Sequence, residues 1–357
     1  MSTFGRRYPI SLFGESHQRA VGFTIHHLPA GIPIDWDAVR QAMKRRMPKT
    51  TNATSRREVD APVVLSGFHQ GTTTGAPLSV MVENHDLKSE DYDALPFRPG
   101  HADYPAHIKH GGANDPRGGG HHSGRLTAPL VALGEIARQA LNDPSIVVGS
   151  HIVSIHQTDG ESLAHPPDKE TLNSLYHSDF PVINSGDAQR FTAVIDAAKA
   201  DHDSVGGVVE TWISGLPVGV GSPFFHGLDG LLAQLIFSIP AVKGLTFGDG
   251  FNLTRLRGSQ ANDPMTHDHH GVRFMKNAMG GVLGGLSSGQ PVRFRTAFKP
   301  TPSIGKPQQT ITQDHHPTTL ALTGRHDTCV VSRAVHVVNA MVYIALLELL
   351  ERNEESL

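Results

Sequence analysis

The sequence predicts a protein of the α/β class, with helices and strands interspersed in a single domain, residues 1–357. Some segments carry apolar residues at helical spacing, whereas others are short runs rich in β-branched residues. The two kinds of segment alternate along the chain. No shift of composition, internal repeat or charged tail marks a linker, which favours one interwoven domain.

Four segments have the apolar spacing of a helix. The first follows Asp35, a residue suited to an N-cap, and ends before Pro48. The second follows the glycines at 118–120 and has Pro129 near its first turn, where proline is tolerated. The other two are expected at 228–236 and 332–351. The apolar face of the last one indicates a helix that packs in the core.

Strands are expected where β-branched and aromatic residues gather between glycines, prolines and asparagine. The predicted strands are 63–65, 78–82, 146–155, 191–195, 208–213, 245–247 and 292–298. The 37 glycines and 24 prolines are spread along the chain, which indicates a loop-rich globular protein.

Composition argues against several classes of protein. The single Cys329 leaves no internal disulfide framework and fits a reducing compartment, so we expect a cytoplasmic location. We find neither a signal-peptide core near Met1 nor an apolar run as long as a membrane span, and we expect no membrane partner. The net charge of −3 gives no overall attraction to nucleic acid, so no nucleic-acid partner is expected.

Two glycine-rich segments are candidates for ligand binding. The first is RGGGHHSGR at 117–125, where glycines permit close backbone approach and the following helix start favours an anion. A flexible turn without a ligand fits the same residues. The second, at 277–285, suits either a ligand or the close packing of two chain segments. Lys299 and Ser303 follow the strand 292–298, and strand ends are common places for ligand contacts.

Histidine is frequent, with 23 residues, and two histidines lie in distinctive motifs. His17 in GESH and His101 in RPGHAD are candidates for acid–base work, because imidazole exchanges protons near neutral pH. Asp327 follows Arg325, whose charge would favour the ionised carboxylate. The run at 267–270 is rich in histidine but lacks cysteine and helical spacing, so we expect a polar loop there and no metal site.

Taken in order, these motifs resemble those of the chorismate synthases from one end of the chain to the other. The collinear segments are 14–17, 57–60, 66–77, 98–104, 238–244, 258–263, 280–285, 299–304 and 324–327. Each motif is weak by itself, but so many in one order are specific.

The resemblance implies a lyase of the shikimate pathway of aromatic amino acid biosynthesis. Its reaction is the anti-1,4-elimination of phosphate from 5-enolpyruvylshikimate 3-phosphate to give chorismate. Reduced FMN is the implied cofactor, reduced either with NADPH or by an external reductase. The implied fold is a β-α-β sandwich with helices between two antiparallel sheets, and the implied assembly is a homotetramer.

The resemblance also implies roles for individual residues. His17 would stabilise or protonate the departing phosphate, His101 would set the protonation of the reduced flavin, and Asp327 would assist proton removal at flavin N5. Substrate would be bound by Arg45, Arg46, Ser123 and Arg125. FMN would be bound by Ser123, Gly124, Arg125, Asn277, Gly280, Lys299, Ser303 and Arg325.

Several positions depart from the usual motifs of that family. They are Met47, His121, His122, Leu126 and Met279. Loss of a bidentate guanidinium from a site for an anionic ligand costs on the order of a few kcal/mol. Two alternatives therefore stay open. One is a paralogous flavin-dependent lyase for a related cyclohexene carboxylate, which would bind FMN without forming chorismate. The other is a non-catalytic oligomeric flavin-binding protein.

Overall fold

The computed structural model describes residues 2–47, 60–85, 96–163, 165–269, 271–322 and 327–350. Most strands belong to two antiparallel sheets. The first sheet contains β1 (Thr3–Phe4), β2 (Ile10–Gly14), β3 (Ala20–Ile25), β7 (Leu78–Glu83) and β4 (Pro62–Ser66), in that spatial order. The second contains β11 (Val242–Phe247), β16 (Val292–Phe298), β10 (Gly207–Ser214), β8 (Val147–Ile155) and β9 (Thr158–Asp159).

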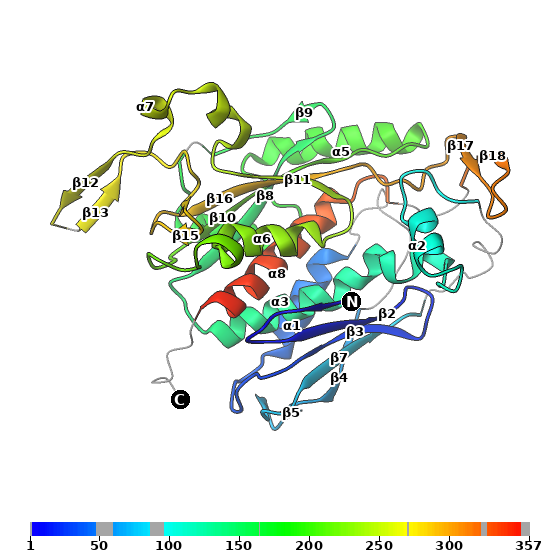
Figure 1. Ribbon diagram of the computed structural model, residues 1–357, viewed down its shortest axis with the longest axis horizontal. Helices are drawn as coiled ribbons and strands as arrows, with labels where there is room; N and C mark the ends of the chain where they lie inside the picture. The colour runs from blue at the N-terminus through cyan, green and yellow to red at the C-terminus, as the bar shows by residue number, and fades with distance from the viewer. Residues whose placement is uncertain are drawn as a thin grey trace.

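The remaining strands form short hairpins. They are β5 (Phe68–His69) with β6 (Thr72–Thr73), β12 (Met265–Asp268) with β13 (Gly271–Phe274), β14 (Val282–Leu283) with β15 (Leu286–Ser287), and β17 (Gln308–Ile311) with β18 (Pro317–Leu320). The hairpin of β12 and β13 projects from the body of the fold (Figure 1).

A layer of helices separates the two sheets. It contains α1 (Trp36–Arg46), α3 (Thr127–Leu141), α6 (Leu228–Phe237) and α8 (Val331–Leu349). Helix α3 contacts β3 and β7 of the first sheet, α8 contacts β8 and β10 of the second, and α3 and α8 pack on each other. In Figure 1 the first sheet lies below these helices and the second above them. The expected β-α-β sandwich is therefore confirmed.

The other helices lie outside this layer. They are α2 (Asp103–Lys109), α4 (Lys169–His177), α5 (Ser185–Ala200) and α7 (Gly258–Ala261), with 3₁₀ turns η2 (Arg117–His122), η3 (Gly124–Leu126), η4 (Phe224–His226) and η5 (Gly250–Arg255). Helices α4 and α5 contact β8, and α5 covers the face of the second sheet that is turned away from α8 (Figure 1).

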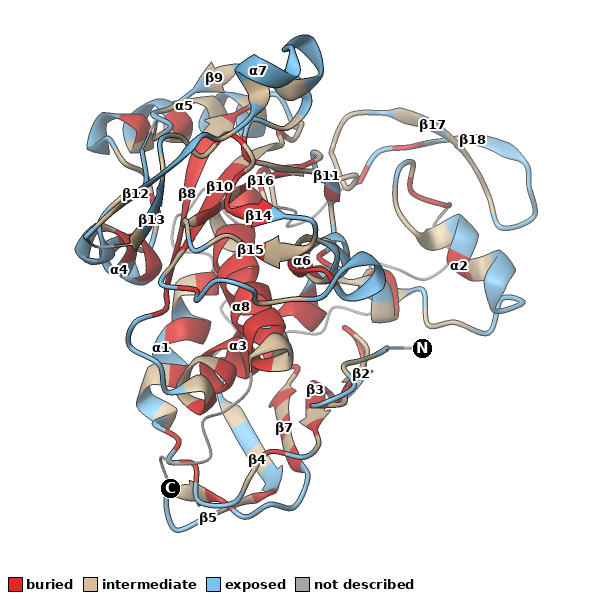
Figure 2. Ribbon diagram, turned by 60° about the vertical axis from the view of Figure 1, so that its left-hand side comes forward, coloured by how far each residue is buried: buried red, intermediate tan, exposed pale blue. Residues whose placement is uncertain are grey.

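The core is centred on α3 and α8, which are buried along most of their length (Figure 2). The two helices approach closely at Gly134, where a Cβ atom would overlap Ala340. By length and composition α8 is apolar enough to cross a membrane, so the expectation that no such run exists was wrong. However, 83% of its apolar window is buried inside the fold, where α8 serves as the central helix.

One predicted strand is wrong. Residues 191–195 lie within helix α5, where Phe191 is fully buried. Asn184 caps this helix by accepting a hydrogen bond from the backbone N–H of Gly186. The surrounding alanine, glutamine and arginine residues favour a helix, and they outweigh the preference of three apolar residues for a strand.

Candidate active site

Two histidines from distant parts of the sequence pack against one glycine turn. A Cβ atom at Gly118 would overlap the imidazole of His17, and one at Gly119 would lie 2.9 Å from Cε1 of His101. Both glycines have positive φ, 57° and 89°, a conformation that other residues rarely adopt. The turn therefore leaves room for no side chain at either position, and it brings the two imidazoles to the same short segment.

Hydrogen bonds fix this turn to the loop that carries His17. The hydroxyl of Ser16 lies 3.0 Å from Nδ1 of His17 and donates to the carbonyl of Arg117 at 3.1 Å. The backbone N–H of Ser16 donates to the carbonyl of Gly120, and Nδ1 of His121 lies 2.8 Å from the carbonyl of Gly14. His121, one of the positions that depart from the family motifs, thus holds the two loops together.

His101 is held by a hydrogen bond to Asp103 in its own loop. Its Nδ1 lies 2.5 Å from Oδ1 of Asp103, and Arg98 donates to both carboxylate oxygens of Asp103 from Nε and Nη2 at 2.7 and 2.8 Å. Burial by itself would raise the pKa of Asp103, but the hydrogen bonds from Arg98 and His101 more than offset it and hold that pKa well below its usual range. Asp103 is therefore a carboxylate at any pH near neutrality.

Two of the residues expected to bind FMN adjoin the His101 loop. Nζ of Lys299 donates to the carbonyl of Gly100 at 2.9 Å, and Nη1 of Arg98 donates to the hydroxyl of Ser303 at 3.3 Å. Partial burial and then the nearby Lys243 lower the pKa of Lys299. Two ammonium groups whose charges repel each other favour an anion between them.

A buried cluster of charges lies at the start of α3. Arg46 donates to Thr127 Oγ1 at 2.8 Å, to the carbonyl of Gly124 at 2.9 Å and to Oδ2 of Asp60 at 3.4 Å. Arg125 donates to the other oxygen of Asp60. Burial, and next the charge of Arg333, lower the pKa of Arg46 to about 9. Among the described residues, Arg46 and Arg125 therefore share the carboxylate of Asp60.

The charge cluster is linked to the loop of His17. Nε of Arg125 donates to Oδ1 of Asn84 at 2.8 Å. The amide of Asn84 in turn donates to the carbonyls of Glu15 and Gln18 at 3.0 and 2.7 Å. Arg125 therefore supports the position of His17 through one intermediate side chain.

Asp327 lies between the charge cluster and the segment of Lys299. Its Oδ2 accepts from Nη1 of Arg333 at 2.5 Å, and Nε of Arg333 donates to the carbonyl of Arg46 at 3.2 Å. The hydroxyl of Thr301 donates to the carbonyl of Asp327 at 2.6 Å. Oδ1 of Asp327 is buried and accepts no hydrogen bond from the part of the chain that the structure describes. A buried carboxylate oxygen of this kind is suited to a ligand that donates a proton.

Some predicted ligand residues lie apart from this group. Gly280 accepts a hydrogen bond from Arg293 and Asn277 donates to Pro291, so both lie near the start of β16, whereas Lys299 follows its end. A strand of this length spans about 20 Å. Within one chain, therefore, the structure does not bring these two residues next to Lys299.

The other predicted ligand residues have mixed positions. The guanidinium of Arg45 lies over the ring of Tyr176 at 5.2 Å, apart from the contacts of Arg46. The hydroxyl of Ser123 accepts from the backbone N–H of Arg125 at 3.3 Å, at the turn into α3. Arg325 lies outside the described residues.

Positions that depart from the family motifs border the same loops. Burial, and then the charges of His121 and His101, lower the pKa of His122. Leu126 is buried at the start of α3, and Met47 caps the end of α1. Met279 donates its backbone N–H to Asp263 at 3.0 Å. Of the five changed side chains, His121 and His122 are therefore the ones that add titratable groups to the site.

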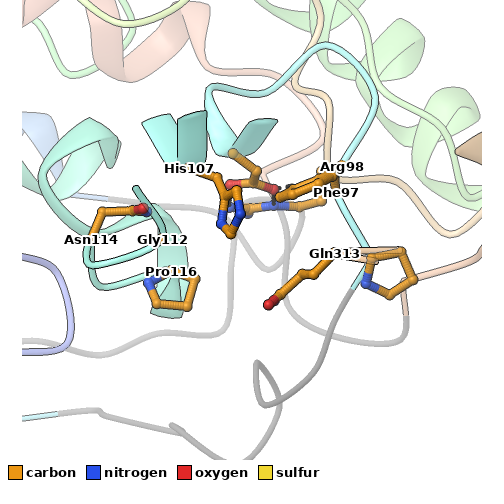
Figure 3. A pocket seen from close by; sticks show the side chains of 9 residues that line it. Phe97, Arg98, His107, Gly112, Asn114, Pro116 and Gln313 are labelled. Atoms are coloured by element: carbon orange, nitrogen blue, oxygen red, sulfur yellow. Dashed lines mark hydrogen bonds and ion pairs between the residues drawn. The ribbon is translucent and has the colours of Figure 1, made fainter. Parts of the chain in front are cut away.

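A small pocket borders the His101 loop (Figure 3). Its lining includes both members of the Arg98–Asp103 pair, together with His107, Asn114 and Gln313. Neither His17 nor Asp327 lines it, so this pocket is not the place where the candidate catalytic groups meet.

Several residues of this site were missed from the sequence. Asp103 and Arg98 belong to the RPGHAD motif, and the position of Asp103 two residues after His101 was the signal that could have revealed it. Asp60 ends the segment 57–60, but nothing in the sequence pairs it with two arginines. Arg333 lies in an apolar helix and gave no signal. Among the described residues, no group of three or more histidine, cysteine, aspartate or glutamate side chains is arranged to hold a metal ion.

The sandwich and its site define an enzyme that acts on an anionic small molecule, with imidazoles, a carboxylate and clustered cations at one set of loops. A family model described as chorismate synthase matches residues 9–350. The chorismate synthases of Porphyromonas gingivalis and Thermococcus kodakarensis are each 42% identical to this chain, over 97% and 98% of it and over 94% and 97% of their own lengths. A crystal structure of chorismate synthase superposes with a TM-score of 0.76 at 27% identity, covering 97% of this chain and 92% of that one.

The chain therefore belongs to the chorismate synthase family. The family expected from the sequence motifs is confirmed, and with it the enzyme class, a carbon–oxygen lyase that acts on phosphates.

Proposed function

We propose that this protein catalyses the anti-1,4-elimination of phosphate from 5-enolpyruvylshikimate 3-phosphate, giving chorismate for aromatic amino acid biosynthesis. The observation that carries the proposal is the packing of His17 and His101 against the adjoining glycines 118 and 119. Two proton-exchanging groups at one turn, next to clustered cations, suit a reaction that expels a phosphate from a substrate with two carboxylates.

We also propose that reduced FMN is the cofactor. The residues present fit such a group. Oδ1 of Asp327 is a buried hydrogen-bond acceptor, and the positive charges of Lys299 and the nearby Lys243 favour an anionic group such as the phosphate of FMN. When bound, reduced FMN supplies the electron-rich group that supports loss of a poor leaving group. Lys299, Ser303, Arg325 and the turn 123–125 would hold it. Asn277 and Gly280 have less support in this role, since they lie at the other end of β16.

The protein's own residues would divide the remaining work. His17, which is buried, would donate a proton to the departing phosphate. Asp327 would accept a proton at its Oδ1. Arg46 and Arg125, which are buried beside the loop of His17, would contribute positive charge toward the anionic substrate.

The direct test is anaerobic incubation of the protein with dithionite-reduced FMN and 5-enolpyruvylshikimate 3-phosphate. We expect phosphate and chorismate to appear in equal amounts. FMN binding without either product would favour the paralogous lyase. Failure to take up FMN would favour the non-catalytic binding protein.

The roles of two candidate residues are tested by substitution. We expect His101→Ala and Asp327→Asn each to lower turnover at least about tenfold with the fold intact, because such groups act mainly in the transition state. Steady-state kinetics measure turnover, and circular dichroism checks that the fold is intact. His177→Ala and Asp37→Asn, on the exposed faces of α4 and α1, are the controls and should leave the rate unchanged. Unchanged rates in both site variants would remove these role assignments.

The proposal extends to the location of the protein, its assembly and the reduction of its flavin. We expect a single-domain, cytoplasmic protein that assembles as a homotetramer and whose flavin is reduced with NADPH or by another protein. Large exposed apolar side chains, among them Phe224, Phe225, Met265 and Val272, support an assembly. Light scattering on the purified protein measures the number of subunits.

A further inference from the structure

We propose that Asp103, clamped by Arg98, is a positioning residue that places the hydrogen on Nδ1 in the neutral form of His101 and so reserves Nε2 for proton exchange. The inference deepens the proposed function and rests on it only where turnover is concerned. The arrangement of the three side chains stands on its own.

The geometry assigns the proton on the ring. Oδ1 of Asp103 lies 2.5 Å from Nδ1 of His101, a hydrogen-bond distance. Arg98 donates to Asp103 from three nitrogens, namely Nε, Nη2 and its backbone N–H, at 2.7, 2.8 and 3.1 Å. A carboxylate held in this way has no proton and can only accept. The hydrogen between Nδ1 and Oδ1 therefore belongs to the imidazole.

The opposite assignment conflicts with the same distances. Nη2 of Arg98 also lies 3.1 Å from Nδ1 of His101, and it would donate to that nitrogen if Nδ1 carried no hydrogen. In that case the lone pair of Nδ1 would face a carboxylate oxygen at 2.5 Å with no hydrogen between them, and the two would repel. Because Nη2 already donates to Asp103 at 2.8 Å, the arginine does not need the imidazole as a partner.

The consequence falls on the other ring nitrogen. A neutral imidazole with its hydrogen on Nδ1 has a free lone pair on Nε2. The Nε2 edge of His101 faces the glycine turn, since a Cβ at Gly119 would lie 3.1 Å from it. This is the turn that also contacts His17 through Gly118. The clamp thus directs the reactive nitrogen of His101 toward the segment that the two histidines share. It resembles the way that a buried aspartate orients the histidine of a hydrolase triad.

The first experiment reads the tautomer directly in the protein without ligands. Histidine labelled with ¹⁵N on the ring gives distinct nitrogen shifts for the two neutral tautomers, and loss of a signal in His101→Gln assigns His101. We expect Nδ1 to carry the hydrogen in the unaltered protein. In Asp103→Leu, Arg98 is the polar neighbour of Nδ1 that remains among the described residues, so we expect the hydrogen to move to Nε2. Hydrogen on Nε2 in the unaltered protein would overturn the inference, whether or not the protein is active.

The second experiment measures turnover. We expect Asp103→Leu to lower kcat on the order of 10- to 100-fold while KM for 5-enolpyruvylshikimate 3-phosphate changes less than about twofold. Asp103→Glu keeps the carboxylate and should recover part of the loss. The matched control is Asp187→Leu, because Asp187 is also buried and bonded to an arginine, Arg190, but touches no imidazole. Its kcat should stay unchanged.

The outcomes separate the two proposals. A switched tautomer in Asp103→Leu with unchanged kcat would overturn the positioning role. If Asp103→Leu does not fold, the test uses the spectrum of the unaltered protein and the rate of Asp103→Glu. Full activity in Asp103→Glu with the hydrogen on Nε2 would likewise overturn the positioning role. If the unaltered protein has the hydrogen on Nδ1 but forms no chorismate, the clamp stands and the proposed function fails.

Discussion

Two buried polar clusters in this protein are assembled in different ways. In the second sheet, the antiparallel register places His151 of β8 and Arg295 of β16 on either side of Glu210 of β10. Nε2 of His151 lies 3.6 Å from Oε1 of Glu210, and Nε of Arg295 donates to Oε2 at 2.8 Å. At the candidate active site, by contrast, Arg46, Asp60 and Arg125 come from a helix end and two separate loops.

The charges of the two clusters differ accordingly. Glu210 is paired with Arg295 and also accepts from Trp212 and Ser162, while burial lowers the pKa of His151 to about 4 and keeps it neutral. The sheet cluster is therefore balanced. In the loop cluster, the carboxylate of Asp60 pairs with both Arg46 and Arg125. Strand register within one sheet therefore assembles the first cluster, whereas the second depends on the convergence of separate segments.

The largest test of this contrast removes the carboxylate of the loop cluster. Asp60→Asn removes the carboxylate that pairs with both buried guanidinium groups, and we expect it to lower the free energy of unfolding by about 3–5 kcal/mol. Urea denaturation measures the change. Asp37→Asn, which breaks the exposed pair with Arg40, is the control and should cost less than about 1 kcal/mol. An equal loss of unfolding free energy in the two variants would mean that the buried pairs of Asp60 stabilise the fold no more than an exposed ion pair does.

A smaller effect is expected from the loop that positions His17. Gly118→Ala places a methyl group on the imidazole of His17, so we expect turnover to fall about tenfold, which corresponds to roughly 1.4 kcal/mol. Gly111→Ala is a close control, because Gly111 has nearly the same φ, 58° against 57°, and open space around its Cα. Backbone strain should lower the stability of both variants by about 1–2 kcal/mol, and overlap with His17 adds to the loss in Gly118→Ala alone. An equal loss of turnover in both would show that strain, and not contact with His17, affects the rate.

The smallest expected effect concerns pH and the sheet cluster. Because the pKa of His151 is lowered from 6.5 to about 4 in the folded state, the unfolded chain binds the proton more readily. The contribution of His151 to the free energy of unfolding is therefore complete above pH 6.5 and is lost as the pH falls toward 4. Between pH 7 and 6 we expect a loss on the order of 1 kcal/mol from this residue. Urea denaturation of His151→Gln should lack this part of the pH dependence, and an unchanged slope would contradict the assignment.

Most elements of the core could be predicted from local patterns. The capped helix at Asp35, the helix that enters after the glycine turn, the apolar helix α8 and the strand β16 all have spacings that are visible within a few residues. The strand predicted at 191–195 failed because three apolar residues weigh less than the helix-forming residues on either side of them. The extent of the single domain and the roles of the site residues stay predictions.

By itself the sequence determined the family, the main helices and the motifs that carry His17, His101 and Asp327, because each of these depends on residues close together in the chain. Only the tertiary structure decided that Asp103 and Arg98 clamp His101, that Asp60 is shared by two arginines, and that Gly280 lies at the far end of β16 from Lys299. Those contacts join loops whose side-chain directions depend on how the two sheets and the helix layer pack, and no local spacing records that packing.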